Sequence, residues 1–579
     1  MYGLLGLLYI SANMYAKNNR ASLYLTKLCP HPEWSQRDPV RGSRLHFSQQ
    51  WTVIADSNNH KSIKTVLPPG PCVHVCIWDH YGLRKCLNLT ALDKHGRVYD
   101  DAQFGCLSWS DCENRLLYVA EKNKFMETND GESLYDYIHV INYTEKRSCV
   151  HMCVIVLKQD RRVYCEDWGE GLSNKSVAVI CVVNLQNGHI NVLQGVPPDV
   201  SPGQALWACS SQSVIFVGWY HEPFRLGLKF CSNRRLESCF VFSMKNSNSS
   251  NFSLSALPRL YGSWKLLTIQ NDLMVVCCSS PNIPPTLLVG FLPLAGEAVT
   301  WRTLQPPIRT FDFHWTVLDV TPPPEEDNTH YSGLDFGAIL VKPSRYLHEA
   351  KIPLVVYIHG GPHSQFPVEW NCTTAGLAKL GFAVLMVNYR GSTGFGQDSI
   401  LSLISHIGSQ DVKDVQRAVL TALQTDNTLD PKRLAVIGGS HGGFLSCHLV
   451  GQYPEFYRAC AARNPVINAA TLLGTSDIVD CMGFQYSYDQ IPTAEALAAM
   501  LEKSPIIHAA QIKAPVLLML GGRDKRVSPH QGLELYKALK SRALPVRLLW
   551  FPDDGHSLSR VDTQADCFLN TVLWMQQHV

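Results

Sequence analysis

One serine in this chain stands in a turn whose composition would expose its hydroxyl group. Residues 438–442 follow the pattern Gly-x-Ser-x-Gly with Ser440 at the centre, and the apolar residues 434–437 lead into it. A hydroxyl is a weak nucleophile unless a tight turn presents it to a base, and flanking glycines permit the strained backbone and close helix packing of such a turn. So short a pattern also occurs in purely structural turns, so Ser440 needs partners.

A nucleophilic serine needs a base and an acid that orients the base, and after a turn of this kind they follow in the order acid, then histidine. Asp524 comes after the apolar run 515–520, and His556 comes after the run 546–551. Both residues therefore lie in a loop just past a predicted strand, where open α/β sheets place their chemistry. We predict a catalytic triad of Ser440, Asp524 and His556.

Asp553 and Asp554 are alternative acids for this triad. Both lie too close in sequence to His556 to reach it from a separate strand end, and Asp is a common turn residue. We therefore interpret the pair as turn residues and keep Asp524 as the acid.

A hydrolytic serine also needs two N–H donors for the oxyanion that forms on the attacked carbonyl. A His-Gly-Gly sequence at 359–361 follows the apolar run 353–358, which is where one donor of such a site belongs, and the residue after the nucleophile supplies the other. We predict that the backbone N–H groups of Gly361 and His441 form this oxyanion hole.

These residues lie beside short apolar runs that are separated by helix-like stretches. Continuous apolar runs, in contrast to alternating ones, are typical of strands that are buried on both faces. The second half of the chain therefore predicts a parallel sheet covered by helices, the α/β-hydrolase fold. The runs include residues 353–358, 380–388, 434–437, 515–520 and 546–551.

Four motifs in this half resemble the peptidase domain of the prolyl oligopeptidase family, and the resemblance runs from about Gly333 to the C-terminus. They occupy residues 359–363, 388–396, 438–443 and 463–466. The resemblance implies a C-terminal α/β-hydrolase preceded by an N-terminal β-propeller that admits only short, unstructured peptides. It further implies removal of one N-acylated, typically N-acetylated, amino acid from such peptides, no metal or organic cofactor, a cytosolic location and a homo-oligomer.

The N-terminal half independently favours a propeller. Trp109 and Trp207 each lead through a polar turn to a short β-prone run, at 115–120 and 213–219. The two copies lie about two blade lengths apart at roughly 40–50 residues a blade. We expect a β-propeller over residues 1–325 and an α/β-hydrolase over 326–579.

About three hundred residues are few for a propeller of this family, and the polar run 244–251 replaces expected blade material with a loop. An unclosed propeller would expose strand edges. The expected propeller is therefore a shortened one, and an inactive chain that acts only by binding stays an alternative function.

Arg463 and Asn464 follow the apolar run 460–462 and should lie near a strand end beside the nucleophile. Their side chains could hydrogen-bond peptide or acyl carbonyls. A surface ion pair or a bond that fixes a loop is an equally open interpretation. Another α/β-hydrolase activity, of a dipeptidyl peptidase or a carboxylesterase, also stays open.

Composition excludes several other classes. A net charge of +2 without a long basic run gives no reason to propose nucleic acid or an anionic membrane as a partner. The apolar run 4–10 is far shorter than the ~20 residues of a membrane span. Twenty cysteines are scattered through a chain long enough to bury a core without disulfides, so we expect reduced thiols, no zinc site and a cytoplasmic protein.

Overall fold

The structure is a computed structural model and falls into two compact units, residues 1–223 with 238–244, and residues 224–237 with 245–579. The residues it describes are 50–55, 73–79, 82–89, 92–101, 103–110, 112, 114–123, 166–208, 213–222, 225, 239–241, 262–270, 273–291, 299–304, 311–344, 351–479 and 493–579. The polar run 244–251 and the apolar run 4–10 lie outside these residues.

An eight-stranded sheet forms the centre of the second unit, with the strand order β15-β16-β18-β17-β19-β20-β21-β22. The strands β17 to β22 pair in parallel, whereas β15 and β16 pair antiparallel at one edge. Their bounds are β15 Phe313–Val320, β16 Phe336–Pro343, β17 Ile352–Ile358, β18 Ala383–Asn388, β19 Leu429–Gly439, β20 Ala459–Arg463, β21 Val516–Gly521 and β22 Val546–Phe551.

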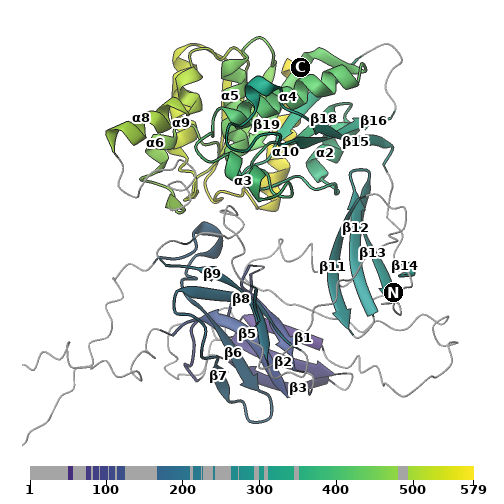
Figure 1. The fold of residues 1–579 in the computed structure, drawn as a ribbon, viewed down its shortest axis with the longest axis vertical. Helices are drawn as coiled ribbons and strands as arrows, with labels where there is room; N and C mark the ends of the chain where they lie inside the picture. The colour runs from purple at the N-terminus through teal and green to yellow at the C-terminus, as the bar shows by residue number, and fades with distance from the viewer. Residues whose placement is uncertain are drawn as a thin grey trace, which may run out of the picture. The chain divides into compact units, whose positions relative to one another are not determined.

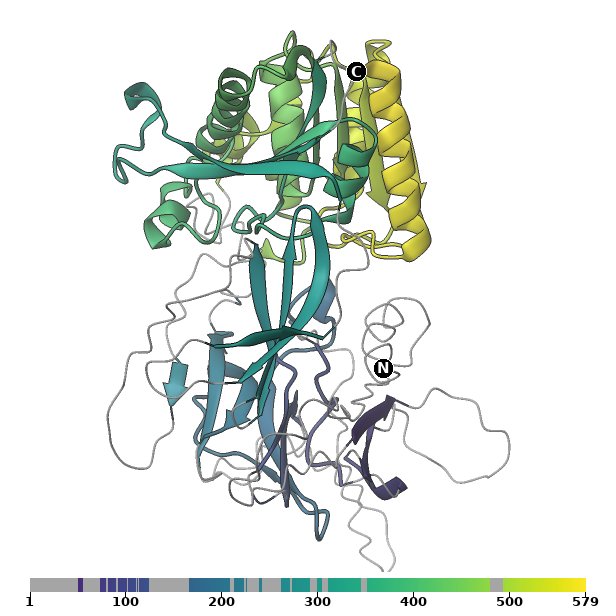
Figure 2. The same cartoon turned by 90° about the vertical axis from the view of Figure 1, so that its right-hand side faces the viewer.

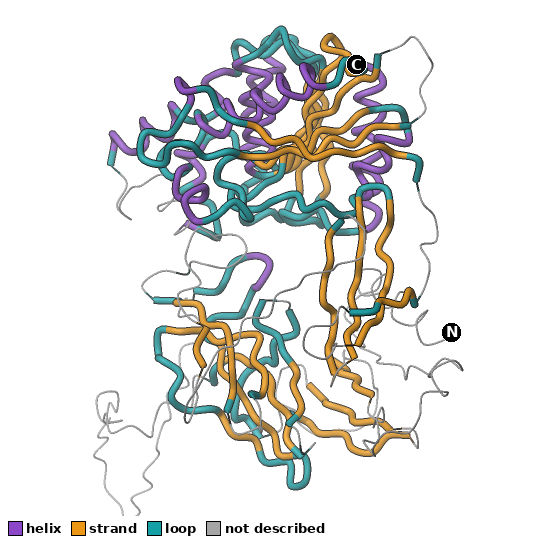
Figure 3. The backbone as a smooth tube through the Cα atoms, turned by 45° about the vertical axis from the view of Figure 1, so that its right-hand side comes forward, coloured by secondary structure: helices purple, strands orange, loops and turns teal. Residues whose placement is uncertain are grey.

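Helices cover both faces of this sheet, so that strands lie between two helical layers (Figure 3). One face packs against α4, α5 and α9, and the other packs against α2 and α10. The long C-terminal helix α10 is prominent along the sheet in Figure 2. The helices are α2 Cys372–Lys379, α3 Gln397–Ser402, α4 Gln410–Thr425, α5 His441–Gln452, α6 Ala469–Leu472, α8 Ala494–Glu502, α9 His530–Ser541 and α10 Val561–His578.

The central strands are apolar along their whole length because alternate residues enter different cores. In β17, Leu354 and Val356 join the core beneath α4 and α5, while Val355 joins the core beneath α2 and α10. All three side chains are fully buried. This confirms the predicted α/β-hydrolase fold, and each of the five apolar runs overlaps one strand of the sheet.

The expected division at residue 325 falls inside the connection between two paired strands. β15 already belongs to the eight-stranded sheet, because Phe313 to Val320 pair with Pro343 to Phe336 of β16. The eight-stranded sheet therefore begins before that position.

In the described part of the N-terminal half, four small antiparallel sheets precede the large one, and each joins strands in sequence order. Both tryptophan repeats lie in such sheets, the first in the β4–β5 hairpin and the second in the β8–β9 hairpin. The first unit holds β1 Gln50–Ala55, β2 Val73–Asp79, β3 Gly82–Asn88, β4 Leu107–Trp109, β5 Arg115–Glu121, β6 Ala178–Asn184, β7 Ile190–Val192, β8 Val200–Trp207, β9 Val214–Tyr220 and β10 Cys239–Val241. The second unit adds β11 Ser263–Gln270, β12 Leu273–Ser280, β13 Ile283–Phe291 and β14 Trp301–Thr303 (Figure 1).

Within the described residues, no helix has the length and apolar character needed to cross a bilayer.

Candidate active site

Ser440 lies at the turn between β19 and α5 in a backbone conformation that L-residues rarely adopt. Its φ is 57° and its ψ is −123°. Its N–H donates to the carbonyl of Arg463 over 2.9 Å, and its own carbonyl accepts from Phe444 N–H at 3.0 Å. A strained non-glycine residue that neighbouring bonds hold in place is typical of a functional site, and a serine at a strand-to-helix turn is how a nucleophile is exposed.

The glycines around Ser440 are required by close backbone contacts. A Cβ on Gly442 would lie 2.2 Å from the carbonyl oxygen of Ile358, and a Cβ on Gly360 would lie 2.8 Å from the carbonyl oxygen of Gly439. Only glycine allows α5 and the 359–361 loop to approach β17 and the turn so closely. The same contacts bring the loop that contains Gly361 beside Ser440.

Asp524 and His556 are joined by a hydrogen bond of 2.7 Å between Oδ2 and Nδ1. The other carboxylate oxygen of Asp524 accepts the backbone N–H groups of Arg526 at 2.9 Å and Val527 at 2.8 Å. Asp524 is buried, whereas part of the imidazole remains accessible. A proton on Nδ1 that points at the carboxylate makes Nε2 the acceptor nitrogen of the ring.

The alternative acids have other partners. Asp553 forms an exposed ion pair with Arg523 at 2.6 Å. Asp554 is buried in the loop between β22 and α10, where it accepts from Thr563 Oγ1 at 2.5 Å and Arg560 N–H at 3.2 Å. These contacts fit the turn role that the sequence indicated for both residues.

Asn464 links the loops that carry Asp524 and His556, the two predicted partners of Ser440. Its Oδ1 accepts Gly521 N–H at 2.8 Å, and its Nδ2 donates to the carbonyl of His556 at 2.8 Å. The residue is buried, with a φ of 39°. These bonds favour the loop-fixing interpretation of Asn464 over a direct substrate contact. Arg463, at the end of β20, lines a cavity that is described below.

His441, the residue after the serine, is held by a buried carboxylate. Its Nε2 lies 2.8 Å from Oδ2 of Asp411, which is completely buried. The other oxygen of Asp411 accepts the N–H groups of Gly408 and Val412. Sequence reasoning missed Asp411; its position in the first turn of a strongly amphipathic helix was the only signal, and any helix start can carry an acid.

The 388–396 motif shapes the loop that leads away from Gly361. Asn388 clamps Phe366 with two bonds, accepting its N–H at 2.7 Å and donating to its carbonyl at 3.0 Å. Arg390 has no exposed surface and forms a bidentate pair with buried Asp414, at 2.6 Å between Nη2 and Oδ1. Asn388 and Arg390 therefore have structural roles, because an amide and a guanidinium are needed to make these hydrogen bonds.

Three buried histidines near the site are held in the neutral state. Burial lowers the pKa of His359 to about 4 and that of His363 to about 4. Burial also lowers the pKa of His448 to about 3. A hydrogen bond from His359 Nδ1 to the Gly360 carbonyl opposes the shift but does not overcome it.

Among the described residues, no group of three or more His, Cys, Asp or Glu side chains converges closely enough to hold a metal ion.

Comparison with known families gives two matches. The family model described as "Prolyl oligopeptidase family" matches residues 368–579. The model described as "Acylamino-acid-releasing enzyme, N-terminal domain" matches residues 67–258.

Two mammalian proteins named acylamino-acid-releasing enzyme are similar to almost the whole chain. The Mus musculus protein is 40% identical over 690 residues, covering 95% of this chain and 93% of its own length. The Homo sapiens protein is 40% identical over 694 residues, with the same coverage. Because both alignments are longer than the 579 residues of this chain, they include stretches of the relatives that have no counterpart here.

The fold is also similar to that of a solved acylaminoacyl peptidase in complex with Z-Gly-Gly-Phe-chloromethyl ketone. That likeness has a TM-score of 0.57 at 14% identity and covers 92% of this chain and 87% of the solved chain. A puromycin hydrolase structure is similar with a TM-score of 0.52 at 18% identity, covering 93% of this chain and 78% of that one.

Proposed function

We propose a catalytic cycle for this chain, which belongs to the prolyl oligopeptidase family and, within it, to the acylamino-acid-releasing enzymes. It is a serine hydrolase of the acylaminoacyl-peptidase type. The cycle assigns a role to each of the three residues of the triad and to two backbone N–H groups.

In the first half of the cycle, Nε2 of His556 accepts the proton of Ser440 as Oγ attacks the peptide carbonyl carbon. Asp524 keeps the other imidazole nitrogen protonated and stabilises the imidazolium that forms. The N–H groups of Gly361 and His441 donate hydrogen bonds to the carbonyl oxygen and stabilise the negative charge that develops on it. The imidazolium then gives its proton to the leaving amine, and an acyl-enzyme remains on Ser440.

In the second half, His556 takes a proton from water, and the resulting hydroxide attacks the acyl-enzyme carbonyl. The proton returns to Ser440 Oγ as the ester bond breaks. The proposed substrate is a short peptide with an acylated, typically acetylated, N-terminal residue, and the product is the N-acyl amino acid. The observation that carries this proposal is the Asp524–His556 hydrogen bond in a chain 40% identical to acylamino-acid-releasing enzymes.

The test compares an N-acetylated peptide with the same peptide bearing a free amino terminus. We expect the enzyme to cleave the acetylated peptide, releasing its first residue, and to leave the free-amino peptide intact. Ser440→Ala should lower kcat by about 10⁴-fold or more. Asp524→Asn should be severely impaired, with Asp553→Asn, an exposed carboxylate, as its matched control. Near-normal turnover in Ser440→Ala would remove the mechanism, whereas preference for the free amine would replace the substrate class with that of a dipeptidyl peptidase.

We further propose that the antiparallel sheets of the N-terminal half are blades of a shortened propeller that limits the size of the substrate. Their strands follow one another in sequence order, as blades require. We also propose that the chain has two domains, an N-terminal propeller and a C-terminal catalytic domain that begins with β15. A cytoplasmic location and a homo-oligomer stay predictions that rest on the family resemblance.

A further inference from the structure

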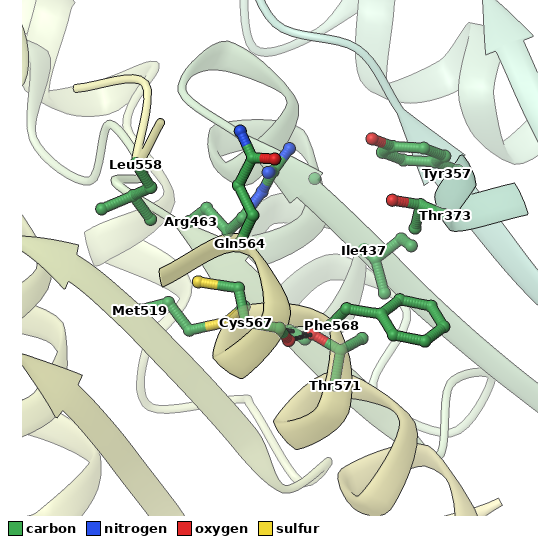
Figure 4. A pocket seen from close by; sticks show the side chains of 12 residues that line it. Tyr357, Thr373, Ile437, Arg463, Met519, Leu558, Gln564, Cys567, Phe568 and Thr571 are labelled. Carbon is green, nitrogen blue, oxygen red and sulfur yellow. Dashed lines mark hydrogen bonds between the residues drawn. The ribbon is translucent and has the colours of Figure 1, made fainter. Parts of the chain in front are cut away.

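A cavity of about 220 Å³ lies in the catalytic domain, apart from the residues of the proposed triad. Its walls come from the strands β17, β19, β20 and β21 and from the helices α2 and α10. The strand residues that line it, among them Ile437 and Met519, belong to the core that α2 and α10 cover. Figure 4 shows Tyr357 and Leu558 at opposite sides of this cavity, and neither Ser440 nor His556 lines it.

Arg463 contributes the positive charge of this cavity. Its guanidinium lies close to Gly439, since a Cβ on that glycine would be 3.5 Å from Nη2. Throughout the described parts of the chain, this side chain has no hydrogen-bond or ion-pair partner. A guanidinium presents five N–H donors in a planar fork that matches a carboxylate. An unpaired guanidinium in a cavity therefore indicates an anionic ligand.

The remaining lining separates into a polar and an apolar part. Thr373, Tyr357 and Gln564 add hydroxyl and amide groups, whereas Ile437, Met519 and Leu558 add apolar surface. Phe568 packs tightly against α2, because a Cβ on Gly376 would lie 2.4 Å from its ring. This contact fixes the distance between α2 and α10 and so helps to keep the shape of the cavity.

We propose that the cavity binds a small organic monocarboxylate, with the carboxylate on Arg463 and a short apolar body against Ile437, Met519 and Leu558. One guanidinium without a second cation selects a singly charged group over phosphate or a dicarboxylate. The volume suits a ligand of a few carbon atoms, because a water molecule takes roughly 30 Å³ of liquid. The walls include Gly438 and Leu558, each two residues from a member of the proposed triad, so the site lies directly behind the catalytic turn.

The test uses butyrate as the probe and ligand-detected NMR on the full chain. We expect saturable binding of butyrate, at least tenfold weaker binding of butyramide, and no competition by phosphate at equal ionic strength. Arg463→Met should weaken butyrate binding at least tenfold, and Arg463→Lys should restore part of it. Equal binding of butyrate and butyramide, or unchanged binding in Arg463→Met, would overturn the proposal.

A second pair of variants tests the location. Cys567→Phe places a ring in the cavity and should abolish binding, whereas Leu569→Phe, on the exposed side of the same helix, should leave it unchanged. Melting temperatures show whether each variant folds; if Cys567→Phe does not, the Arg463 series decides. Binding that survives a correctly folded Cys567→Phe would contradict the proposed location.

The last control separates this cavity from the substrate cleft. Protein whose serine has been labelled with a fluorophosphonate should still bind butyrate, because Ser440 does not line the cavity. Loss of binding after labelling would place the anion in the cleft and overturn the inference. This control alone rests on the proposed function. A failure of the probe to label Ser440 would contradict the hydrolytic mechanism, but the results of the Arg463 and Cys567 variants would remain valid.

Discussion

The Asn464 side chain connects the loops that carry two residues of the proposed triad. Its amide holds Gly521, which precedes the acid loop, and the carbonyl of His556 itself. Its own N–H donates to Met519 of β21 at 2.9 Å. Because these bonds connect strand ends that are far apart in the sequence, the amide fixes the acid and the base relative to each other.

We therefore predict that Asn464→Ala lowers kcat by about 10- to 100-fold, the cost of a displacement of about 1 Å in a catalytic group. KM should change little, and the melting temperature should fall because buried backbone groups lose their partners. Asn570→Ala, which removes an exposed amide from α10, is the matched control. A raised KM with unchanged kcat would restore the substrate-binding role of Asn464.

At this scale the sequence predicted three catalytic residues but not the residues that support them. Ser440, Asp524 and His556 could be proposed because each stands at a fixed place after an apolar run, and the structure joins Asp524 to His556. Asp411 could not, because its partner His441 lies 30 residues away and no local pattern joins them. Buried polar contacts between distant residues depend on the tertiary fold, which residue spacing does not encode.

At the scale of helices and strands, the close contact between α5 and β17 determines the position of Ser440. Gly442 lies in the first turn of α5, where even one extra methyl group would meet the carbonyl of Ile358 at 2.2 Å. This carbonyl belongs to a central strand that is fixed by pairing on both sides, so the helix would have to move. Such a movement would displace Ser440, which precedes the helix.

Gly442→Ala should consequently destabilise the catalytic domain by about 1–3 kcal/mol or more, the usual cost of overpacking a core, and should abolish labelling by a serine-directed probe. Gly474→Ala is the control, because a Cβ there meets no atom within 4 Å. Denaturant unfolding and probe labelling check both effects. Equal stability of the two variants would contradict the close contact.

Parallel strands were predictable as elements because burial on both faces makes them continuously apolar. The antiparallel edge formed by β15 and β16 was not predicted from these runs. β15 has a mixed pattern with an exposed Val317 and a half-buried Leu318, as expected for an edge strand, and therefore carries no continuous apolar signal. Because β15 carries no such signal, the expected domain boundary at residue 325 falls after this strand, although the strand belongs to the eight-stranded sheet.

At the scale of the whole molecule, the neutral histidines link stability to pH. Unfolded histidine has a pKa of about 6.5, whereas burial lowers the pKa of His359 and His363 to about 4 in the fold. Between these values the unfolded chain binds protons that the folded chain does not. Stability is therefore complete above pH 6.5 and decreases as the pH falls toward 4.

Each of these histidines should remove about 1.4 kcal/mol of stability per pH unit within that window. Unfolding of the full chain at pH 7, 6 and 5 measures the slope, and His530→Gln, an exposed histidine, should leave it unchanged. A free energy of unfolding that does not change between pH 7 and pH 5 would show that these side chains are not buried as neutral imidazoles.

The length of the substrate is the property that the proposed N-terminal propeller should control. Alignments of 690 and 694 positions on a 579-residue chain mean that this protein lacks segments present in its mammalian relatives. A propeller with less blade material has a more open edge or a wider passage, and either would weaken the exclusion of long peptides.

We predict that the chain releases the acetylated residue from longer peptides than the Mus musculus relative does. A series of acetylated peptides of increasing length, assayed with both proteins, measures the decline in kcat/KM, and Ser440→Ala corrects for contaminating peptidases. Sizing chromatography with a serine-directed probe establishes that the active species is the intact folded chain. The same length limit in both proteins would mean that the missing segments do not contribute to gating, and the shortened-propeller argument would fail while the catalytic assignment would remain.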